Sequence, residues 1–487
     1  MRKTSQLDAN ESGMQNPHRW KALVLLALAQ FLIILDTSII GVALPTIQDH
    51  FGFSQSDLQW IFNAYVIVFG ALLLLGGRLT DILGQKKIFI IGFMILTASS
   101  IAAGLASSGS VLIAARAFQG LGAAFIAPSA LAIVMTLFGN NKNEMNKAMG
   151  IWGAAAPAGG TAGVFWGGII TAWVDWTWVF LINVPIGIAV LALASKLLPK
   201  GEIQKGKVDY AGAITVTGAL ILLVYAIVTA NEIGWTALQS LATLSIAGVL
   251  FFGFLYMQKK SKEPLLPLNI FKIRNLLASN IVMGLLGAAW IPMWFFLNLY
   301  LQLVLGYGAF ESGLALLPMT VAIMFLMVFI TPKMVNRFGV RKNMIVGMAL
   351  LSLGMISFIM TPPSNANQGS SFFIYVLPAS LIAAIGMSLA YIPVLTAALS
   401  NIQPKQAGLG SGLVNTSYQI GSALGLAIMV AWSSEQSEAL ISSGVPQIIA
   451  MNNGFHFAFI GSAIISAIAT ALILFLIKNK KQREIIK

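Results

Sequence analysis

Two charged residues, Asp36 and Arg116, are the only acid and the only base that lie away from the ends of the long apolar stretches of this 487-residue sequence. An ionised carboxylate is costly in lipid, so Asp36 must face the interior of a helical bundle, where it is suited to carry a proton. At a rise of about 1.5 Å per residue, Asp36 lies about 13 Å from Pro45 along its stretch. Arg116 lies about 8 to 9 Å from Ser110, which predicts that both charges occupy the same leaflet. A static structural ion pair is the alternative interpretation.

The composition places these two residues in a membrane protein. Of all residues, 57% are hydrophobic and 9% charged, and the mean hydropathy is +0.84, whereas soluble proteins are about a quarter charged. The sequence has no cysteine, and His18, His50 and His456 are scattered, so we expect no disulfide, thiolate catalyst or metal site. No G-x-x-x-x-G-K-[ST] motif occurs, so we expect no cofactor and a proton gradient in place of ATP.

Fourteen apolar runs are long enough to cross a bilayer, since a spanning helix needs about 20 residues. They lie at about 20–44, 58–77, 88–108, 111–138, 148–170, 179–198, 210–229, 238–257, 276–304, 312–330, 343–361, 372–396, 407–432 and 454–477. With a cytoplasmic N-terminus, every Lys and Arg except Arg116 falls in an inward segment, as expected for cytoplasmic loops. The net charge of +13 is therefore mainly a topology signal, which argues against nucleic acid as a partner and places both termini in the cytoplasm.

A short basic segment occurs twice, as GRLTDILGQKK at Gly77–Lys87 and PKMVNRFGVRK at Pro332–Lys342, which align without gaps. This repeat makes helices 1 to 6 and 9 to 14 equivalent bundles, and two similar bundles around a midplane site are typical of alternating-access transporters. The predicted organisation is a cytoplasmic tail, a six-helix bundle, two additional helices with a cytoplasmic linker, a second six-helix bundle and a cytoplasmic tail, at 1–19, 20–198, 199–275, 276–477 and 478–487.

At these segments the chain resembles the major facilitator superfamily, and within it the fourteen-span drug:proton antiporters. The first copy of the repeat is similar to the superfamily's loop motif G-x-L-x-D-R-x-G-R-K-x, although Ile82 and Gln85 occupy two slots that are basic in the motif. LDTSIIGVALP from Leu35 and LIAARAFQGLGAA from Leu112 resemble the motifs of the first and fourth helices. WTWVFLINVPIG from Trp176 and AGLGSGLVNTSYQIGSALG from Ala407 also look like family segments.

Glycines in the predicted fifth helix fill every glycine slot of the antiporter motif, while Val164 replaces its proline; they are Gly150, Gly159, Gly163, Gly167 and Gly168. Three of them fall four residues apart and line one helix face, where another helix can approach closely. Ordinary helix packing is one interpretation of this stripe. The resemblance implies another, a tight interface between the two bundles that limits leak and favours exchange.

The resemblance also implies roles for the charged and aromatic residues. Asp36 would exchange a proton with a cationic substrate, and Arg116 would influence its proton affinity. The repeated loop would form an inner gate from Gly77, Asp81, Gly84, Lys86, Asn336, Arg337, Gly339 and Arg341; a solvated acid is an equal interpretation of Asp81. Candidates for a substrate cavity are Gln30, Asn63, Tyr65, Gln119, Trp290, Trp294, Asn298, Tyr300, Tyr391, Asn415, Tyr418 and Gln419.

The sequence therefore predicts an all-α integral membrane protein of the major facilitator fold, with fourteen spans. It predicts a monomeric multi-pass plasma-membrane protein, not an enzyme, that exports lipophilic, mostly monocationic or zwitterionic drugs in exchange for protons. One alternative is a proton-coupled transporter of a dedicated physiological substrate, such as a metabolite, lipid or peptide. A more distant one is a multispan membrane enzyme, although such an enzyme would need a cluster of His, Asp or Glu at the membrane surface.

Overall fold

The fold is all-helical over the part of the chain that the computed structural model describes, which has no strand there. The described residues are 18–138, 142–199, 209–261, 264–266, 268, 273–363, 371–399 and 407–477. Helices satisfy every internal backbone hydrogen bond within one segment, which is why apolar runs of this length fold as helices in lipid.

The elements follow one another with short connections. In chain order they are α2 (Arg19–Phe51), α3 (Gln55–Leu58), α4 (Trp60–Leu83), α5 (Gln85–Gly104), α6 (Gly109–Phe138), α7 (Lys142–Trp173), α8 (Trp178–Leu181), α9 (Asn183–Leu197), α10 (Tyr210–Ile233), α11 (Leu238–Lys260), α12 (Arg274–Leu299), the π-helix η2 (Tyr300–Val304), α13 (Ala309–Phe325), η3 (Leu326–Ile330), α14 (Thr331–Phe338), α15 (Val340–Phe358), η4 (Phe372–Val376), α17 (Leu377–Leu399), α18 (Ala407–Ser442) and α19 (Gln447–Leu476).

Twelve of the described helices are long and apolar enough to cross a membrane, and a bent pair within α4 raises the number to thirteen. The α7 helix has 32 residues and packs against α2, but its glycine-rich sequence is not among the candidate spans. The all-α membrane fold is thus confirmed, while the number of fourteen spans stays a prediction.

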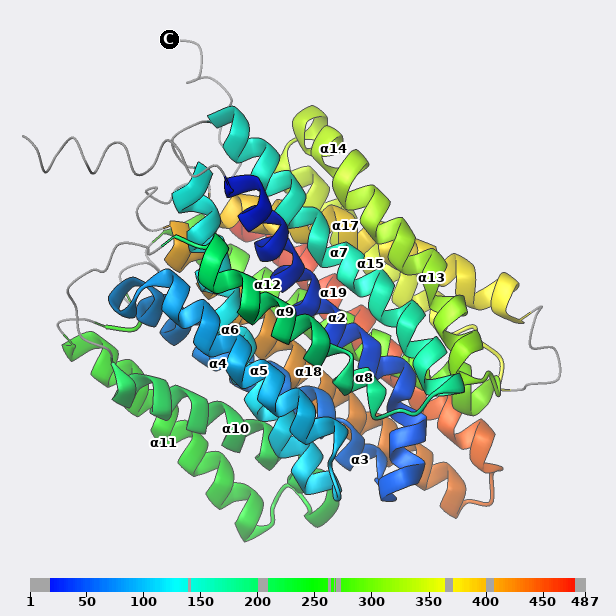
Figure 1. Cartoon of the computed structure of the whole chain (residues 1–487). Helices are drawn as coiled ribbons and strands as arrows, with labels where there is room; N and C mark the ends of the chain where they lie inside the picture. The colour runs from blue at the N-terminus through cyan, green and yellow to red at the C-terminus, as the bar shows by residue number, and fades with distance from the viewer. Residues whose placement is uncertain are drawn as a thin grey trace, which may run out of the picture.

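The helices group into two bundles with a hairpin beside them (Figure 1). In the first bundle α2 packs on α7, and α6 packs on α4 and α5; in the second, α12 packs on α18 and α19, and α15 packs on α17 and α19. The bundles meet along two seams, one between α4 and α18 and the other between α7 and α13. The α10–α11 hairpin lies at one edge in Figure 1, and α10 contacts both α4 and α18.

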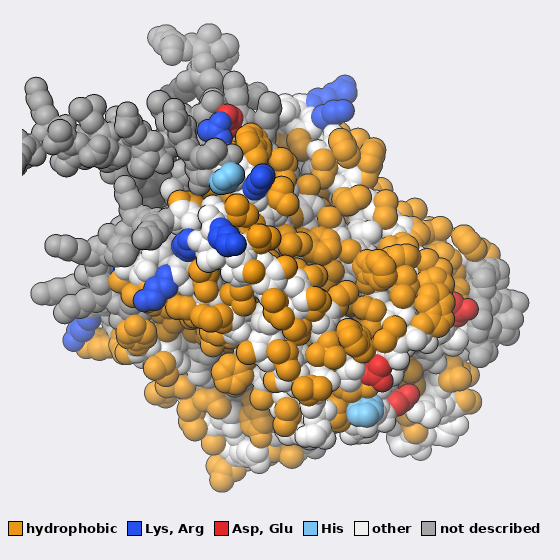
Figure 2. Space-filling model, in the orientation of Figure 1, with side chains coloured by type: hydrophobic (Ala, Val, Ile, Leu, Met, Phe, Trp, Pro, Cys, Tyr) orange, Lys and Arg blue, Asp and Glu red, His pale blue; other side chains and the backbone are white. Residues whose placement is uncertain are grey.

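Charged side chains separate towards the two ends of the helices. Figure 2 shows a broad apolar surface with Lys and Arg gathered towards one end and most Asp and Glu towards the other. We call the first the basic end, marked by Arg19, Lys86, Lys196, Arg337 and Arg341, and the second the acidic end, marked by Asp49, Asp57, Asp175 and Glu311. Such a division is typical of a protein that lies across a bilayer.

Candidate functional site

Five helices of the first bundle converge on one buried polar cluster. Asp36 comes from α2, Arg116 and Gln119 from α6, Ser100 from α5, Asn183 from α9 and Tyr65 from α4. Asp36, Arg116, Gln119, Ser100 and Tyr65 have no exposed surface, and Asn183 is 1% exposed. The spacing of Arg116 and Gln119 explains why both reach the cluster, since residues three apart lie on the same face of a helix.

The centre of this cluster is an ion pair between Asp36 and Arg116. The Nη1 atom of Arg116 donates to Oδ2 of Asp36 at 2.6 Å and to Oε1 of Gln119 at 2.7 Å. Its Nε donates to the carbonyl oxygen of Ile61 at 3.1 Å, and its guanidinium carbon lies 4.5 Å from the centre of the Tyr65 ring. The pair therefore joins α2, α4 and α6, and removing one partner of such a buried pair typically costs about 3–5 kcal/mol.

Amide side chains complete the surroundings of the Asp36 carboxylate. The Nε2 atom of Gln119 donates to Oδ1 of Asp36 at 3.1 Å and to Oγ of Ser100 at 2.8 Å. Nδ2 of Asn183 donates to the same Oδ1 of Asp36 at 2.5 Å. Asp36 thus accepts hydrogen bonds from three side chains on two other helices, an arrangement that suits its ionised form.

Sequence reasoning found Asp36, Arg116 and Gln119 but assigned no role to Asn183 or Ser100. Asn183 lies in the segment WTWVFLINVPIG, where it is the only amide, and this was the available signal. Ser100 is one of two consecutive serines in α5, and nothing in its sequence context distinguishes it. No group of three His, Cys, Asp or Glu among the described residues could hold a metal ion.

The cavity candidates do not form one cluster. Tyr65 and Gln119 belong to the polar cluster, whereas Nδ2 of Asn63 donates to Oε1 of Gln59 in its own chain segment at 3.4 Å. Nδ2 of Asn298 donates to the carbonyl of Trp294 at 2.8 Å, and the hydroxyl of Tyr300 donates to the carbonyl of Pro362 at 3.0 Å. Both are therefore tied to backbone carbonyls of the second bundle.

A second group of cavity candidates lies between α17 and α18. The Tyr391 hydroxyl donates to Oδ1 of Asn415 at 3.4 Å, and its ring meets that of Tyr418 edge-on, with centres 5.8 Å apart. Gln419 packs closely against Gly70 of α4, across the seam between α4 and α18. Gln30 and Trp290 are half-buried and buried respectively, on α2 and α12.

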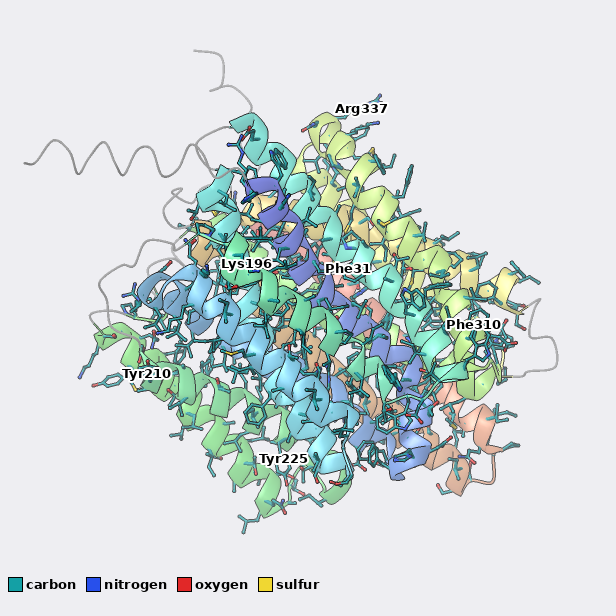
Figure 3. The ribbon with its side chains drawn as sticks, viewed as in Figure 1. Phe31, Lys196, Tyr210, Tyr225, Phe310 and Arg337 are labelled. Carbon is teal, nitrogen blue, oxygen red and sulfur yellow. The ribbon has the colours of Figure 1, made fainter. Side chains whose placement is uncertain are left out.

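Three contacts, one of them made by the cavity candidate Trp294, join the bundles in the half of the molecule towards the acidic end. The Trp294 ring of α12 lies directly against Gly41 of α2. Nε2 of Gln302 donates to the carbonyl of Val42 at 2.9 Å. The rings of Trp173 and Phe310 lie 4.6 Å apart, where the end of α7 meets the start of α13; Phe310 is labelled in Figure 3. These contacts close the bundles against each other at this end.

The glycine stripe of α7 lies within the first bundle. A Cβ on Gly163 would lie 2.8 Å from Cβ of Ser38 and 3.0 Å from the carbonyl oxygen of Leu35, and one on Gly167 would lie 2.7 Å from the carbonyl oxygen of Ile39. Gly159 similarly approaches the backbone of Phe31, which lies near the middle of α2 in Figure 3.

The expectation that this stripe forms the interface between the bundles is therefore wrong for Gly159, Gly163 and Gly167. Helical spacing shows which glycines share a face but not which helix covers that face. Gly168 does contact the second bundle, because its Cβ would lie 3.0 Å from the carbonyl oxygen of Ala309 on α13. The surroundings of Gly150 are outside the part of the chain that the structure describes.

The two copies of the repeated loop make equivalent contacts at the basic end. Gly84 and Gly339 end α4 and α14 with φ of +96° and +81°, a conformation that favours glycine. Nζ of Lys86 then donates to the carbonyl oxygens of Ser195 and Leu198 at the end of α9. Nη2 of Arg341 donates to the carbonyl of Leu474 near the end of α19. Each basic residue thereby binds the C-terminal end of the last helix of its own bundle.

Of the remaining loop residues, two are half-buried and two are exposed. Gly77 lies in α4 opposite Pro128, and Asp81 is half-buried four residues later. Asn336 and Arg337 are exposed on α14, and the Arg337 guanidinium lies 5.2 Å from the ring of the adjacent Phe338. Asn336 and Arg337 are therefore accessible at the basic end (Figure 3 labels Arg337).

The fold and the buried ion pair together define a multi-span membrane protein built from two helical bundles, the architecture of a membrane transporter. The family model described as Major Facilitator Superfamily matches residues 26–426, so the chain belongs to the Major Facilitator Superfamily.

Relatives in sequence agree with this family, and a solved structure has a similar fold. The cephamycin export protein CmcT of Amycolatopsis lactamdurans is 35% identical over 91% of this chain and 89% of that protein. The puromycin resistance protein pur8 of Streptomyces alboniger is 32% identical over 85% of this chain and 82% of that protein. An auto-inhibited peptide transporter of the POT family has a similar fold, with a TM-score of 0.68 at 15% identity over 95% of this chain and 98% of the other.

Proposed function

We propose that this protein is a proton-coupled exporter of lipophilic, mostly monocationic or zwitterionic drugs. The observation that carries the proposal is the buried Asp36–Arg116 pair, because the apolar spans offer no second acid and intramembrane ionisable residues mark ion pathways by default. The names of the relatives, which export or confer resistance to antibiotics, support drugs as the substrate class.

The exchange follows from competition for one carboxylate. A cationic substrate that enters from the cytoplasm attracts the ionised form of Asp36 and displaces its proton. Arg116 supplies a compensating positive charge when Asp36 holds neither proton nor substrate. Protonation of Asp36 from outside then weakens its attraction for the substrate and releases it, which couples drug export to proton entry.

Alternating access requires the contacts between the bundles to open and close. We propose that the basic end faces the cytoplasm, with both termini on that side, because basic loops are retained there. The contacts of Trp294 with Gly41 and of Trp173 with Phe310 would then close the outer side and must separate for release. The domain division at 20–198, 199–275 and 276–477 follows this scheme, in which the first and last units rock against each other.

The loop and glycine residues take supporting roles in this proposal. Lys86 and Arg341 each bind the end of a helix of their own bundle, so that each bundle moves as one body at the inner gate. The glycines Gly159, Gly163 and Gly167 hold α7 close to α2, the helix that carries Asp36. The pair Tyr391 and Tyr418 offers aromatic faces to a flat cation.

The test is accumulation of ethidium in cells that express the protein. Expression should lower the steady-state accumulation, and an uncoupler that collapses the proton gradient should abolish the difference. The Asp49→Asn variant serves as the matched control for substitution of Asp36, because Asp49 is an exposed acid on the same helix. Equal accumulation with and without expression, over a panel of lipophilic cations, would refute drug export and favour a dedicated physiological substrate.

A further inference from the structure

Protonation of Asp36 creates a requirement that the cluster as observed does not meet. The three side chains that contact its carboxylate, those of Arg116, Gln119 and Asn183, all present donors. A protonated carboxyl carries an O–H group of its own, which needs an acceptor in a buried site. A proton carrier at this position therefore needs a neighbour that can accept this hydrogen bond, and a side chain that donates to Asp36 can do so only by presenting an acceptor in place of its donor.

Apart from those of Asn183 and Tyr65, the other acceptors in this cluster each already accept a hydrogen bond. Oε1 of Gln119 accepts from Nη1 of Arg116 at 2.7 Å, the carbonyl oxygen of Ile61 accepts from its Nε at 3.1 Å, and Oγ of Ser100 accepts from Gln119 at 2.8 Å. Oδ1 of Asn183, in contrast, is buried without a hydrogen-bond partner. A buried amide oxygen left unpaired is costly, so it marks a place where another arrangement of the site is to be expected.

Asn183 carries both groups that the two states of Asp36 require. Its Nδ2 lies 2.5 Å from Oδ1 of Asp36 and serves the ionised form. A half-turn about its Cβ–Cγ bond, a torsion with broad two-fold minima, would bring Oδ1 to the same place and serve the protonated form. Asn183 is also the first residue of α9, directly after the break that separates this helix from α8.

We propose that Asn183 is a positioning residue of the proton site, which donates a hydrogen bond to ionised Asp36 and accepts one from protonated Asp36. This inference rests on the proposed function. No covalent bond other than the O–H bond of the carboxyl forms or breaks, and the amide exchanges only hydrogen-bond partners. Because Asn183 begins α9, the turn of its amide gives that helix a contact that depends on the proton.

Few other groups near Asp36 can titrate. Among the described residues, α6 presents Arg116 and α4 presents Tyr65, whose hydroxyl also lacks a partner. The other helices packed here present uncharged groups: α5 presents Ser100, α7 its glycine stripe and α12 Trp294. The Tyr65 hydroxyl is the competing acceptor, and the experiment must distinguish it from Asn183.

The experiment is ethidium binding to purified protein as a function of pH, compared for wild type, Asn183→Leu and Asn183→Asp. The leucine variant loses the hydrogen bond to ionised Asp36, which is charged, and the weaker hydrogen bond from protonated Asp36, which is neutral. The ionised form therefore loses more stabilisation, and the midpoint of the pH dependence of ethidium binding should move about one pH unit towards alkaline pH. The isosteric aspartate variant should move it further in the same direction, because two adjacent carboxylates favour a shared proton. The aspartate variant also tests the proposal if the leucine variant fails to fold.

Asn452→Leu is the matched control, because Asn452 is also 1% exposed, donates to a backbone carbonyl of another segment and has an unpaired Oδ1. Its midpoint should equal that of wild type. If both Asn183 variants keep the wild-type midpoint, the assignment to Asn183 is overturned. A shifted midpoint in Tyr65→Phe, with none in the Asn183 variants, would overturn it in favour of Tyr65. Both outcomes leave the proposed function intact. Wild-type binding without pH dependence would overturn both.

Discussion

Replacing Gly163 by alanine should separate α2 from α7 and disturb the ion pair. The new Cβ would lie 2.8 Å from Cβ of Ser38 and 3.0 Å from both the Leu35 carbonyl oxygen and the Ile39 nitrogen. Ordinary contacts between such atoms are about 3.5–4.0 Å, so α2 must move by about half an ångström to one ångström. Overpacking of this kind typically costs about 1–3 kcal/mol.

The moved stretch of α2 carries Asp36, which lies between two of the contacted residues. A displacement of this size would lengthen its 2.6 Å contact with Arg116 enough to weaken the hydrogen bond, since such contacts lose strength steeply beyond the normal range. We therefore expect Gly163→Ala to lower the unfolding temperature and to reduce proton-driven efflux about tenfold or more.

Gly160→Ala is the matched control in the same helix. A Cβ on Gly160 would find its nearest neighbours, Cγ2 of Ile34 and Oγ of Ser38, at 3.8 Å, which is an ordinary contact. Alanine also favours helix over glycine by about 1 kcal/mol, so this variant should be as stable as wild type or more so. The assays are thermal unfolding in detergent and ethidium efflux from proteoliposomes. Equal behaviour of the two variants would refute the close α2–α7 contact.

Three further predictions follow from the ion pair, the basic-end loop and the acidic-end seam. Arg116→Gln should abolish proton-driven ethidium efflux, because it leaves Asp36 without its counter-charge at a cost of about 3–5 kcal/mol; efflux at the wild-type rate would contradict this. Lys86→Met should unfold at a lower temperature than Lys87→Met, because Lys86 binds the end of α9 and Lys87 is exposed; identical unfolding would exclude that contact. A short thiol crosslinker between cysteines at Trp173 and Phe310 should stop transport in this otherwise cysteine-free chain, and continued transport in the crosslinked protein would show that this seam need not open.

Features that depend on one residue's chemistry could be predicted from the sequence. The cost of a charge in lipid predicted that Asp36 faces the bundle interior, and a count of residues along each helix predicted that Arg116 lies at a similar depth. The structure places the two side chains in contact. Membrane composition and the repeated loop likewise predicted the all-α fold with two bundles.

Features that depend on which helix faces cover each other could not be predicted in this way. Helices such as α2 and α6 are apolar on all sides, so their sequence periodicity gives no direction in the bundle. For this reason the spacing of Gly159, Gly163 and Gly167 did not reveal that α2 covers them, and the contribution of Asn183 went unnoticed. Both depend on contacts between residues more than a hundred positions apart.

The most direct test of proton coupling is ethidium efflux from proteoliposomes driven by an imposed pH gradient, compared for wild type, Asp36→Asn and Asp49→Asn. Asparagine retains the size of the side chain but binds no proton, so Asp36→Asn should show no efflux in response to the gradient. Asp49→Asn, which removes an exposed acid from the same helix, should retain the wild-type rate. Gradient-driven efflux by Asp36→Asn at the wild-type rate would contradict the assignment of Asp36 as the proton carrier.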